Sequence, residues 1–396
     1  MRNPKITNDN KYSNLRQHTL LASTLYVLIT LPISDASHAP WAGLLALLLA
    51  LSDGGWRRVM SSHRTVIYLT AGLIVFSLLT SELPDKTLTG SYNYLRGMLL
   101  LPPALLLADR ADSRQHAQWL LGLSMIAVTI LIWLTIYLYD EARFSNALYD
   151  YCNNILDENP HNLINSVAIT LLCLIAVTIH AHQKAMRFTA LAASIFILWL
   201  LVYLRSEGTW LALGITLFAL LMLYIRRKWF FATATMLILI IASSQLVFIF
   251  PDWFHEHTSV HLGGFQTRAQ IYTATLQSWL ESPWTGHGIN TFKYLGIGQI
   301  PGIETPFIHP HEIYLEILVS VGILGSALLA LITYKLLRHV RLEAVRSTPL
   351  AMTGYLVTIY LAGKGLTDMK FFSLYPIGLF FLGLGFMSSR ITPRAR

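Results

Sequence analysis

Long apolar runs, separated by short polar segments, repeat along almost the whole chain. A helix needs about 20 apolar residues to cross the hydrocarbon core of a membrane, and twelve runs approach or reach this length. They lie near residues 18–35, 39–52, 65–82, 91–108, 118–139, 163–182, 187–205, 209–225, 229–250, 312–335, 350–367 and 370–389. The pattern predicts an all-α polytopic membrane protein with about 12 transmembrane helices, in a single integral membrane domain over residues 1–396. The Pro102–Pro103 pair predicts a kink in the fourth helix.

Two of the connections between these runs are long. Residues 140–162 are acidic, and residues 251–311, between the ninth and tenth predicted helices, form the longest connection. Within the second, TRAQIYTATLQSWLESP has the pattern of a short amphipathic helix, with Thr267 as its N-cap and Ser282–Pro283 at its end. Because long connections in compact proteins usually have a function, we expect residues 251–311 to be a partly helical loop that bears part of a functional site.

Composition strengthens the membrane assignment. The chain is 54% hydrophobic and only 13% charged, whereas soluble domains are about 25% charged. A net charge of +8 would suggest a nucleic-acid partner in a soluble protein, but cytoplasmic loops of membrane proteins collect Lys and Arg, so no nucleic acid is expected. The two cysteines, Cys152 and Cys173, are too few for a disulfide framework and have no metal-ligand spacing.

The basic residues also predict the orientation of the chain. With both termini cytoplasmic, 21 of the 29 Lys and Arg residues fall in inner segments, as expected from the excess of positive charge on the cytoplasmic side. The remaining eight, on or towards the outer side, are Lys86, Arg96, Arg143, Arg205, Arg268, Lys293, Lys364 and Lys370.

Three of these outer arginines are candidates for binding. Arg96 lies in an apolar segment, where it is either a snorkelling anchor or part of a site. Arg205 shares a tight turn with Glu207, and Arg268 opens the loop helix, where its charge opposes the helix dipole. Guanidinium groups match phosphate oxygens in pairs. If these arginines converge, they would bind a lipid-linked phosphate or diphosphate at the outer face.

Two histidines precede the tenth predicted helix. His309 and His311 flank Pro310, and Glu312 and Glu316 follow on one helix face. A metal site could be built from these histidines with three others in the loop, but no recognised ligand spacing appears, so no metal is expected. Neutral imidazole is an effective general base near pH 7. The three loop histidines are His255, His257 and His261.

The segment HPHEIYLEILVSVGILG resembles the motif of the O-antigen ligase and polymerase superfamily. In that motif a His is followed by an amide or small polar residue, nine further residues and Gly-x-x-Gly; His311, Glu312, Gly322 and Gly325 fit this spacing. TRAQIY resembles the family's loop arginine through Arg268. SPWTGHGINTF resembles its proline–glycine loop motif through Pro283, Gly286 and Gly288. The resemblance covers roughly residues 190–390.

The resemblance implies a membrane glycosyltransferase of the GT-C type that uses no metal, cofactor or nucleotide sugar. Such enzymes transfer a glycan from a polyprenyl diphosphate carrier to an acceptor at the periplasmic face, with inversion at the anomeric carbon. His311 would be the general base and Arg268 would stabilise the departing diphosphate. His309, Glu312 and Glu207 are further candidates for a supporting role.

The chain departs from the family pattern after the seventh predicted helix. Direct alignment puts Glu207 at the position of a family arginine, and Arg205, two residues earlier, is the favoured replacement. Arg96 resembles a basic residue of the family's fourth helix and joins Arg205 and Arg268 as a candidate diphosphate contact.

The favoured function is an O-antigen ligase of the bacterial inner membrane. Its donor would be O-antigen on undecaprenyl diphosphate, its acceptor lipid A–core oligosaccharide, and membrane lipids would surround it. An O-antigen or capsule polymerase and a protein O-oligosaccharyltransferase share the same donor chemistry and stay open as alternatives. A secondary transporter or flippase is less favoured, because transporters bind substrate near the bilayer midplane, whereas the ionisable groups here lie towards outer helix ends.

Overall fold

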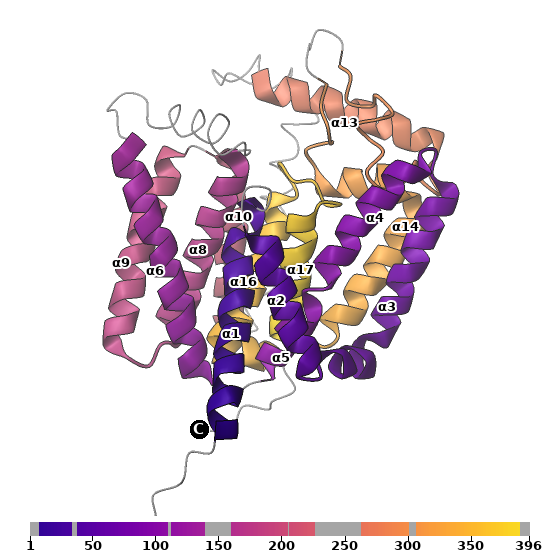
Figure 1. Cartoon of the computed structure of the whole chain (residues 1–396). Helices are drawn as coiled ribbons and strands as arrows, with labels where there is room; N and C mark the ends of the chain where they lie inside the picture. The colour runs from indigo at the N-terminus through magenta and orange to yellow at the C-terminus, as the bar shows by residue number, and fades with distance from the viewer. Residues whose placement is uncertain are drawn as a thin grey trace, which may run out of the picture.

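The computed structural model describes residues 8–33, 38–109, 112–138, 160–204, 206–225, 263–300 and 306–388, and in these residues it contains helices and no strand. Figure 1 shows the helices standing side by side as a bundle. They are α1 (Asn8–Thr30), η1 (Leu31–Ile33), α2 (Ala39–Ser52), α3 (Gly55–Thr80), α4 (Pro84–Met98), α5 (Leu101–Ala108), α6 (Ser113–Leu138), α8 (Pro160–His180), α9 (Lys184–Tyr203), α10 (Glu207–Tyr224), α13 (Gly263–Glu281), α14 (Ile313–Leu337), α15 (Leu342–Ser347), α16 (Pro349–Lys364) and α17 (Leu374–Met387).

Most of the predicted spans have a helical counterpart. Six described helices are long and apolar enough to cross a membrane: α3, α6, α8, α9, α10 and α14; α2 and α17 are shorter apolar helices. The predicted kink in the fourth span is confirmed, because α4 and α5 are separate helices that meet just before Pro102. The ninth predicted span, 229–250, lies outside the described residues.

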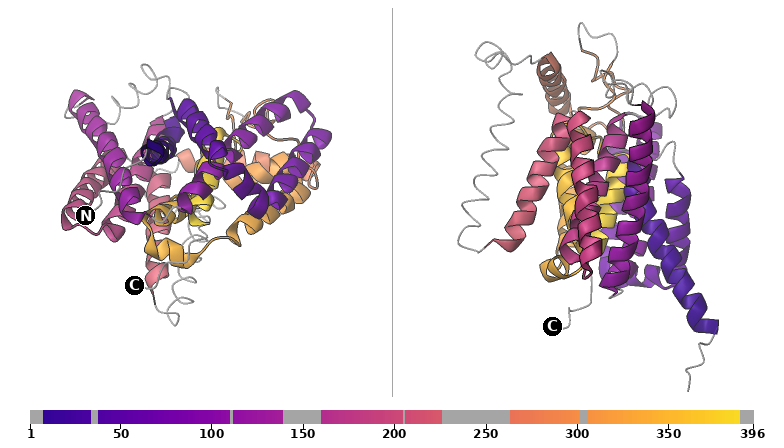
Figure 2. Two further views of the ribbon diagram at one scale, coloured as in Figure 1. Left: turned by 60° about the horizontal axis from the view of Figure 1, so that its bottom comes forward. Right: turned by 90° about the vertical axis from the view of Figure 1, so that its left-hand side faces the viewer.

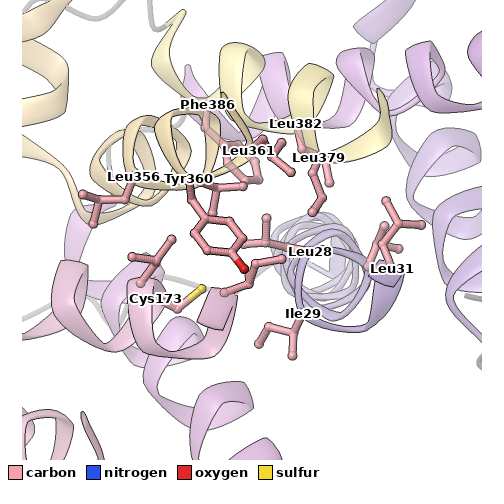
Figure 3. Packing of buried hydrophobic residues seen from close by; sticks show 14 of the residues in the cluster. Leu28, Ile29, Leu31, Cys173, Leu356, Tyr360, Leu361, Leu379, Leu382 and Phe386 are labelled. Carbon is pink, nitrogen blue, oxygen red and sulfur yellow. The ribbon is translucent and has the colours of Figure 1, made fainter. Parts of the chain in front are cut away.

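The centre of the bundle is packed with apolar side chains from distant parts of the sequence. In Figure 3, Tyr360 of α16 lies among Leu28 of α1, Cys173 of α8 and Phe386 of α17. The Tyr360 hydroxyl donates a hydrogen bond of 2.7 Å to Asn165 Oδ1, so its polar end is satisfied in an otherwise apolar environment. Cys173 is buried as a free thiol.

Helix α13 lies across one end of the bundle (Figures 1 and 2). It begins at Gly263, so the prediction that Thr267 caps its start is wrong, because regular helical backbone extends a turn further than the cap pattern indicates. Its predicted end before Ser282–Pro283 is confirmed. A small apolar cluster, separate from the main core, holds this region together. Its buried members are Ile271, Phe292, Ile300 and Val319.

The helix α14 is broken in its middle, and the break receives the loop that follows α13. Gly322 has φ of 61° and ψ of −168°, a conformation open essentially to glycine alone. The freed backbone groups bond to the loop: His287 N donates to Val319 O (2.9 Å) and Ile323 N donates to Pro283 O (2.9 Å). The loop therefore supplies the partners that a broken spanning helix needs, and it ties α13 to α14.

Candidate functional site

His311 lies just before α14, at the end of the bundle that carries α13. Its backbone φ is 59°, which is uncommon for a residue other than glycine. The ring Nδ1 lies 2.8 Å from Asp368 Oδ1. An ionised carboxylate can only accept, so Nδ1 donates this bond. The Nε2 atom of the neutral ring then keeps a lone pair that can accept a proton.

Asp368 belongs to the segment of residues 365–373 that joins α16 to α17. Burial alone would raise the pKa of this carboxyl, but the hydrogen bond from His311 and the charges of Lys364 and His161 hold the pKa well below its usual range. Its second oxygen lies 3.8 Å from His161 Nδ1. Asp368 is therefore an ionised carboxylate that fixes the orientation of the His311 ring.

His309 packs directly on His311. The two ring centroids are 4.1 Å apart, and the backbone N–H of His311 donates to His309 Nδ1 at 3.1 Å. Burial, and then the neighbouring His311, lower the pKa of His309 to about 3. His309 is thus a neutral ring that holds the His311 backbone in its unusual conformation.

Glu312 is the N-cap of α14. Its carboxylate accepts hydrogen bonds from the backbone N–H groups of Tyr314 (3.1 Å) and Leu315 (2.6 Å), a contact that stabilises helix starts. Burial raises the pKa of Glu312 to about 7, despite these two hydrogen bonds. An amide or a small polar residue at this position could make the same cap, so Glu312 keeps a contact that the family's usual residues could also make.

Arg268 lies on α13 and is half-buried. It interacts electrostatically with Tyr272, one turn further on, and with His161 and Lys364 of the bundle. His161 in turn lies beside Asp368. The structure thus brings Arg268 and His311, two residues predicted from the sequence, into one polar cluster.

Lys364 is a member of this cluster that sequence reasoning did not assign. It ends α16, is only 1% exposed and interacts electrostatically with Asp368 and Arg268. It also packs against the start of α10: a Cβ added to Gly208 would lie 3.2 Å from Lys364 Nζ. Lys364 therefore joins the His311 cluster to the turn between α9 and α10.

That turn holds the two residues left open by the sequence. Glu207 is exposed and begins α10, where an acidic side chain stabilises the helix dipole. Arg205 lies outside the described residues, as do His255, His257 and His261. The neighbouring Ser206 hydroxyl shares a 2.8 Å hydrogen bond with Thr209.

Arg96 lies elsewhere. It lines an open, largely apolar groove of about 400 Å³ with Trp41 of α2 and Leu374 of α17, and its guanidinium lies 5.3 Å from the Tyr92 ring centroid. Within the described part of the chain, no observed contact joins Arg96 to Arg268 or His311.

One group of side chains could hold a metal ion. His309, His311 and Asp368 each offer one ligand atom, and these atoms lie within 4.8 Å of one another. The Nδ1 atoms of both histidines already make the hydrogen bonds described above, so a metal would have to use the Nε2 atoms or replace these bonds.

Asp368 and His161 were also missed from the sequence. Asp368 is the only acidic residue between positions 344 and 396. Its isolation between two outer lysines, Lys364 and Lys370, is the one feature of the sequence that could have indicated a role in the site. His161 begins a long apolar run 150 residues before His311, and nothing local relates the two.

The fold and this cluster define a polytopic helical membrane protein with ionisable groups gathered at one end of its bundle. Residues 192–330 match the O-antigen ligase family, so the chain carries a domain of that family. Proteins of this family are ligases and polymerases that transfer lipid-linked glycans. The match includes Arg268 and His311 but ends before Lys364 and Asp368. No curated protein matches the chain.

Proposed function

We propose that this protein is an O-antigen ligase of the bacterial inner membrane. It transfers a polysaccharide from undecaprenyl diphosphate to lipid A–core oligosaccharide at the periplasmic face. The observation that carries the proposal is the Asp368–His311 pair beside Arg268, because a base and a cation for a leaving group are the two groups this transfer needs. We also propose a GT-C architecture with about twelve spans and both termini in the cytoplasm. In this arrangement residues 251–311 form a periplasmic loop that bears part of the active site.

The proposed reaction is a single displacement. His311 Nε2 takes the proton of an acceptor hydroxyl, and the acceptor oxygen forms a bond to the anomeric carbon of the donor sugar. The bond from that carbon to the diphosphate oxygen breaks, and the electron pair leaves with undecaprenyl diphosphate. Attack opposite the leaving group inverts the anomeric centre. Asp368 holds the His311 ring and stabilises the imidazolium that forms.

The leaving diphosphate is the role proposed for the cationic side chains. Arg268 is half-buried on α13, where a guanidinium can bind two phosphate oxygens. We assign Arg205 and Lys364 to the same diphosphate, since Lys364 lies against the turn that carries Arg205. Arg96 would contact the carrier from the groove beside α2.

A polymerase would use the same donor chemistry with another lipid-linked repeat as acceptor, and a protein O-oligosaccharyltransferase would use a Ser or Thr hydroxyl. Transport is disfavoured, because transporters bind substrate at the broken parts of helices near the midplane. Here the His311 cluster lies at helix ends, and the backbone groups at the break in α14 are bonded to the 283–288 loop.

Deleting the gene in its host and resolving the lipopolysaccharide on gels tests the proposal. A ligase deletion removes the whole polysaccharide ladder while the lipid-linked polymer accumulates; core bearing a single repeat would indicate a polymerase instead. Complementation with His311→Ala or Arg268→Ala should leave the ladder absent. Complementation with His182→Ala, an exposed histidine of the α8–α9 turn, should restore it.

The proposed reaction needs no metal. Transfer by the purified enzyme should therefore continue in EDTA. Loss of transfer in EDTA, with recovery on adding back a divalent cation, would assign His309, His311 and Asp368 to metal binding instead.

A further inference from the structure

A second polar site lies at the opposite end of the bundle from His311. The start of α3, the end of α14 and the end of α17 meet there around a cavity of about 340 Å³, within the range of about 300–1,000 Å³ typical of ligand pockets. Every residue that lines it has a polar or charged side chain, and none is acidic. Besides two serines of α3, they are Arg58, His63, Arg338, His339, Arg341 and Ser388.

Arg58 is a rigid part of the cavity wall. It is 9% exposed, and its Nε lies 2.7 Å from Asp109 Oδ2. It also donates to Ser62 Oγ (2.8 Å) and to the backbone oxygen of Ser388 (3.2 Å). Asp109 is not among the lining residues and pairs with Arg58, and Arg338 and Arg341 add further positive charge to the lining.

His63 provides an independent indication of a ligand. It is 2% exposed, and neither of its ring nitrogens has a hydrogen-bond partner among the described residues. Buried polar groups are nearly always hydrogen-bonded, so a donor and an acceptor that face a polar cavity indicate a missing partner. The backbone of α3 leaves helical geometry at this residue (φ −127°, ψ 15°), and the ring lies 4.6 Å from that of His339.

We propose that this cavity binds a phosphate group. Guanidinium groups match phosphate oxygens in pairs, and the imidazole and serine side chains add neutral donors. The phosphate could belong to a lipid headgroup or be free in solution, and the same groups would recognise both. The site is separate from the His311 cluster, so this proposal does not depend on the proposed transferase activity.

Binding to the full-length protein in detergent tests the site with two probes. Equilibrium dialysis with radiolabelled inorganic phosphate measures the free anion. Native mass spectrometry with short-chain phosphatidylglycerol measures binding of a lipid headgroup. Phosphatidylcholine is the comparison, because its choline cation cancels the charge of its phosphate, and a cavity lined by arginines should bind it more weakly. Binding of inorganic phosphate identifies a free-anion site, and binding of phosphatidylglycerol alone identifies a lipid site.

Matched double variants show whether the cavity is responsible. Arg338→Gln with Arg341→Gln removes two charges that line it and should weaken binding of the successful probe at least 10-fold. Arg57→Gln with Arg64→Gln removes two exposed charges of α3 that do not line it and should leave binding within about 2-fold, by simple screening of surface charge. The proposal is overturned if the wild-type protein binds neither probe, or if both double variants weaken binding equally.

Discussion

At the scale of single residues, His311 is held in a conformation it would not adopt alone. A non-glycine residue at positive φ costs on the order of 1–3 kcal/mol. Two hydrogen bonds maintain it, one from its backbone N–H to His309 and one from its side chain to Asp368. Such strain is typical of active sites, where the surrounding structure fixes a reactive group. The geometry therefore supports a base whose ring orientation is set before substrate arrives.

The Asp368→Asn variant keeps the His311 ring but removes the carboxylate that fixes its orientation and its proton. The Asn amide can donate to Nδ1, which places the proton on Nε2 and removes the base. We expect kcat to fall by about 10²–10⁴-fold, with little change in KM, in a transfer assay with purified enzyme. Asp85→Asn, an exposed acid at the start of α4, serves as the control.

The double variant Asp368→Asn, His311→Ala provides a stricter check. Residues that act as one unit are strongly non-additive, so the double variant should be no slower than His311→Ala alone. Additive losses would contradict a role of Asp368 through His311.

Glu312 gives a prediction about pH. Its folded-state pKa is raised to about 7 from 4.5, so the folded chain binds this proton more tightly than the unfolded chain. Its contribution to stability is therefore complete below the unfolded pKa and is lost as pH rises through about 7. Glu312→Asn keeps a cap without a titrating group, and its Tm should fall less than that of the wild type between about pH 5 and about pH 8. Glu312→Ala should lose about 1 kcal/mol of stability with the cap. Identical pH profiles for wild type and Glu312→Asn would contradict this assignment.

At the scale of elements, the break in α14 explains two of the motif glycines, Gly322 and Gly286. A Cβ on Gly322 would lie 2.4 Å from the backbone carbon of Trp284, and a Cβ on Gly286 would lie 2.6 Å from Gly322 N. Contacts this short leave no room for any side chain. The two glycine motifs are thus the two sides of one backbone contact, which joins the loop to α14 and positions Arg268 relative to His311.

Gly322→Ala should therefore disrupt this contact. The substitution adds a clash with the backbone and forces alanine into positive φ. We therefore expect the free energy of unfolding to fall by about 2–3 kcal/mol and transfer to be lost. Gly72→Ala in α3, where a Cβ meets nothing within 4 Å, should be neutral or slightly stabilising. Thermal unfolding of both variants in detergent provides the measurement. Equal stability of Gly322→Ala and Gly72→Ala would mean that the contact between the loop and α14 does not stabilise the fold.

The sequence predicts the helices well because hydrophobic runs alone determine where a chain can span a membrane. It also indicates His311 and Arg268, since each lies in a short local motif. Asp368 could not be found this way, because its pairing with His311 spans 57 residues and depends on how α16 and α14 pack. The spacing of the glycines indicates the motif, but the contact between Gly286 and Gly322 follows only from the way the loop folds onto α14.

At the scale of the whole molecule, the polar groups divide between two ends of an apolar bundle. The His311 cluster lies with α13 at one end, and Arg58, His63 and Arg338 lie at the other. Figure 1 shows α13 across the top of the bundle and α5, which packs against α3, near its bottom. The excess of Lys and Arg at the second end agrees with a cytoplasmic orientation of that end.

Thiol labelling tests this orientation. In a background lacking Cys152 and Cys173, Gln277→Cys on the exposed face of α13 should react with a membrane-impermeant reagent in intact spheroplasts. Glu343→Cys, exposed on α15, should react only after permeabilisation. The reverse result would place the His311 cluster in the cytoplasm and exclude a periplasmic transferase.

The separate apolar cluster beneath α13 has a consequence for how such a protein can diversify. Ile271 and Val319 fasten the loop helix to α14 through a core of its own, whereas the pair of His311 and Asp368 depends on α14 and the α16–α17 segment. In the proposed transferase, substitutions in the small cluster would therefore change how Arg268 meets the lipid-linked donor without altering the pair of His311 and Asp368. We expect descendants of this architecture to change their donors more readily than their chemistry.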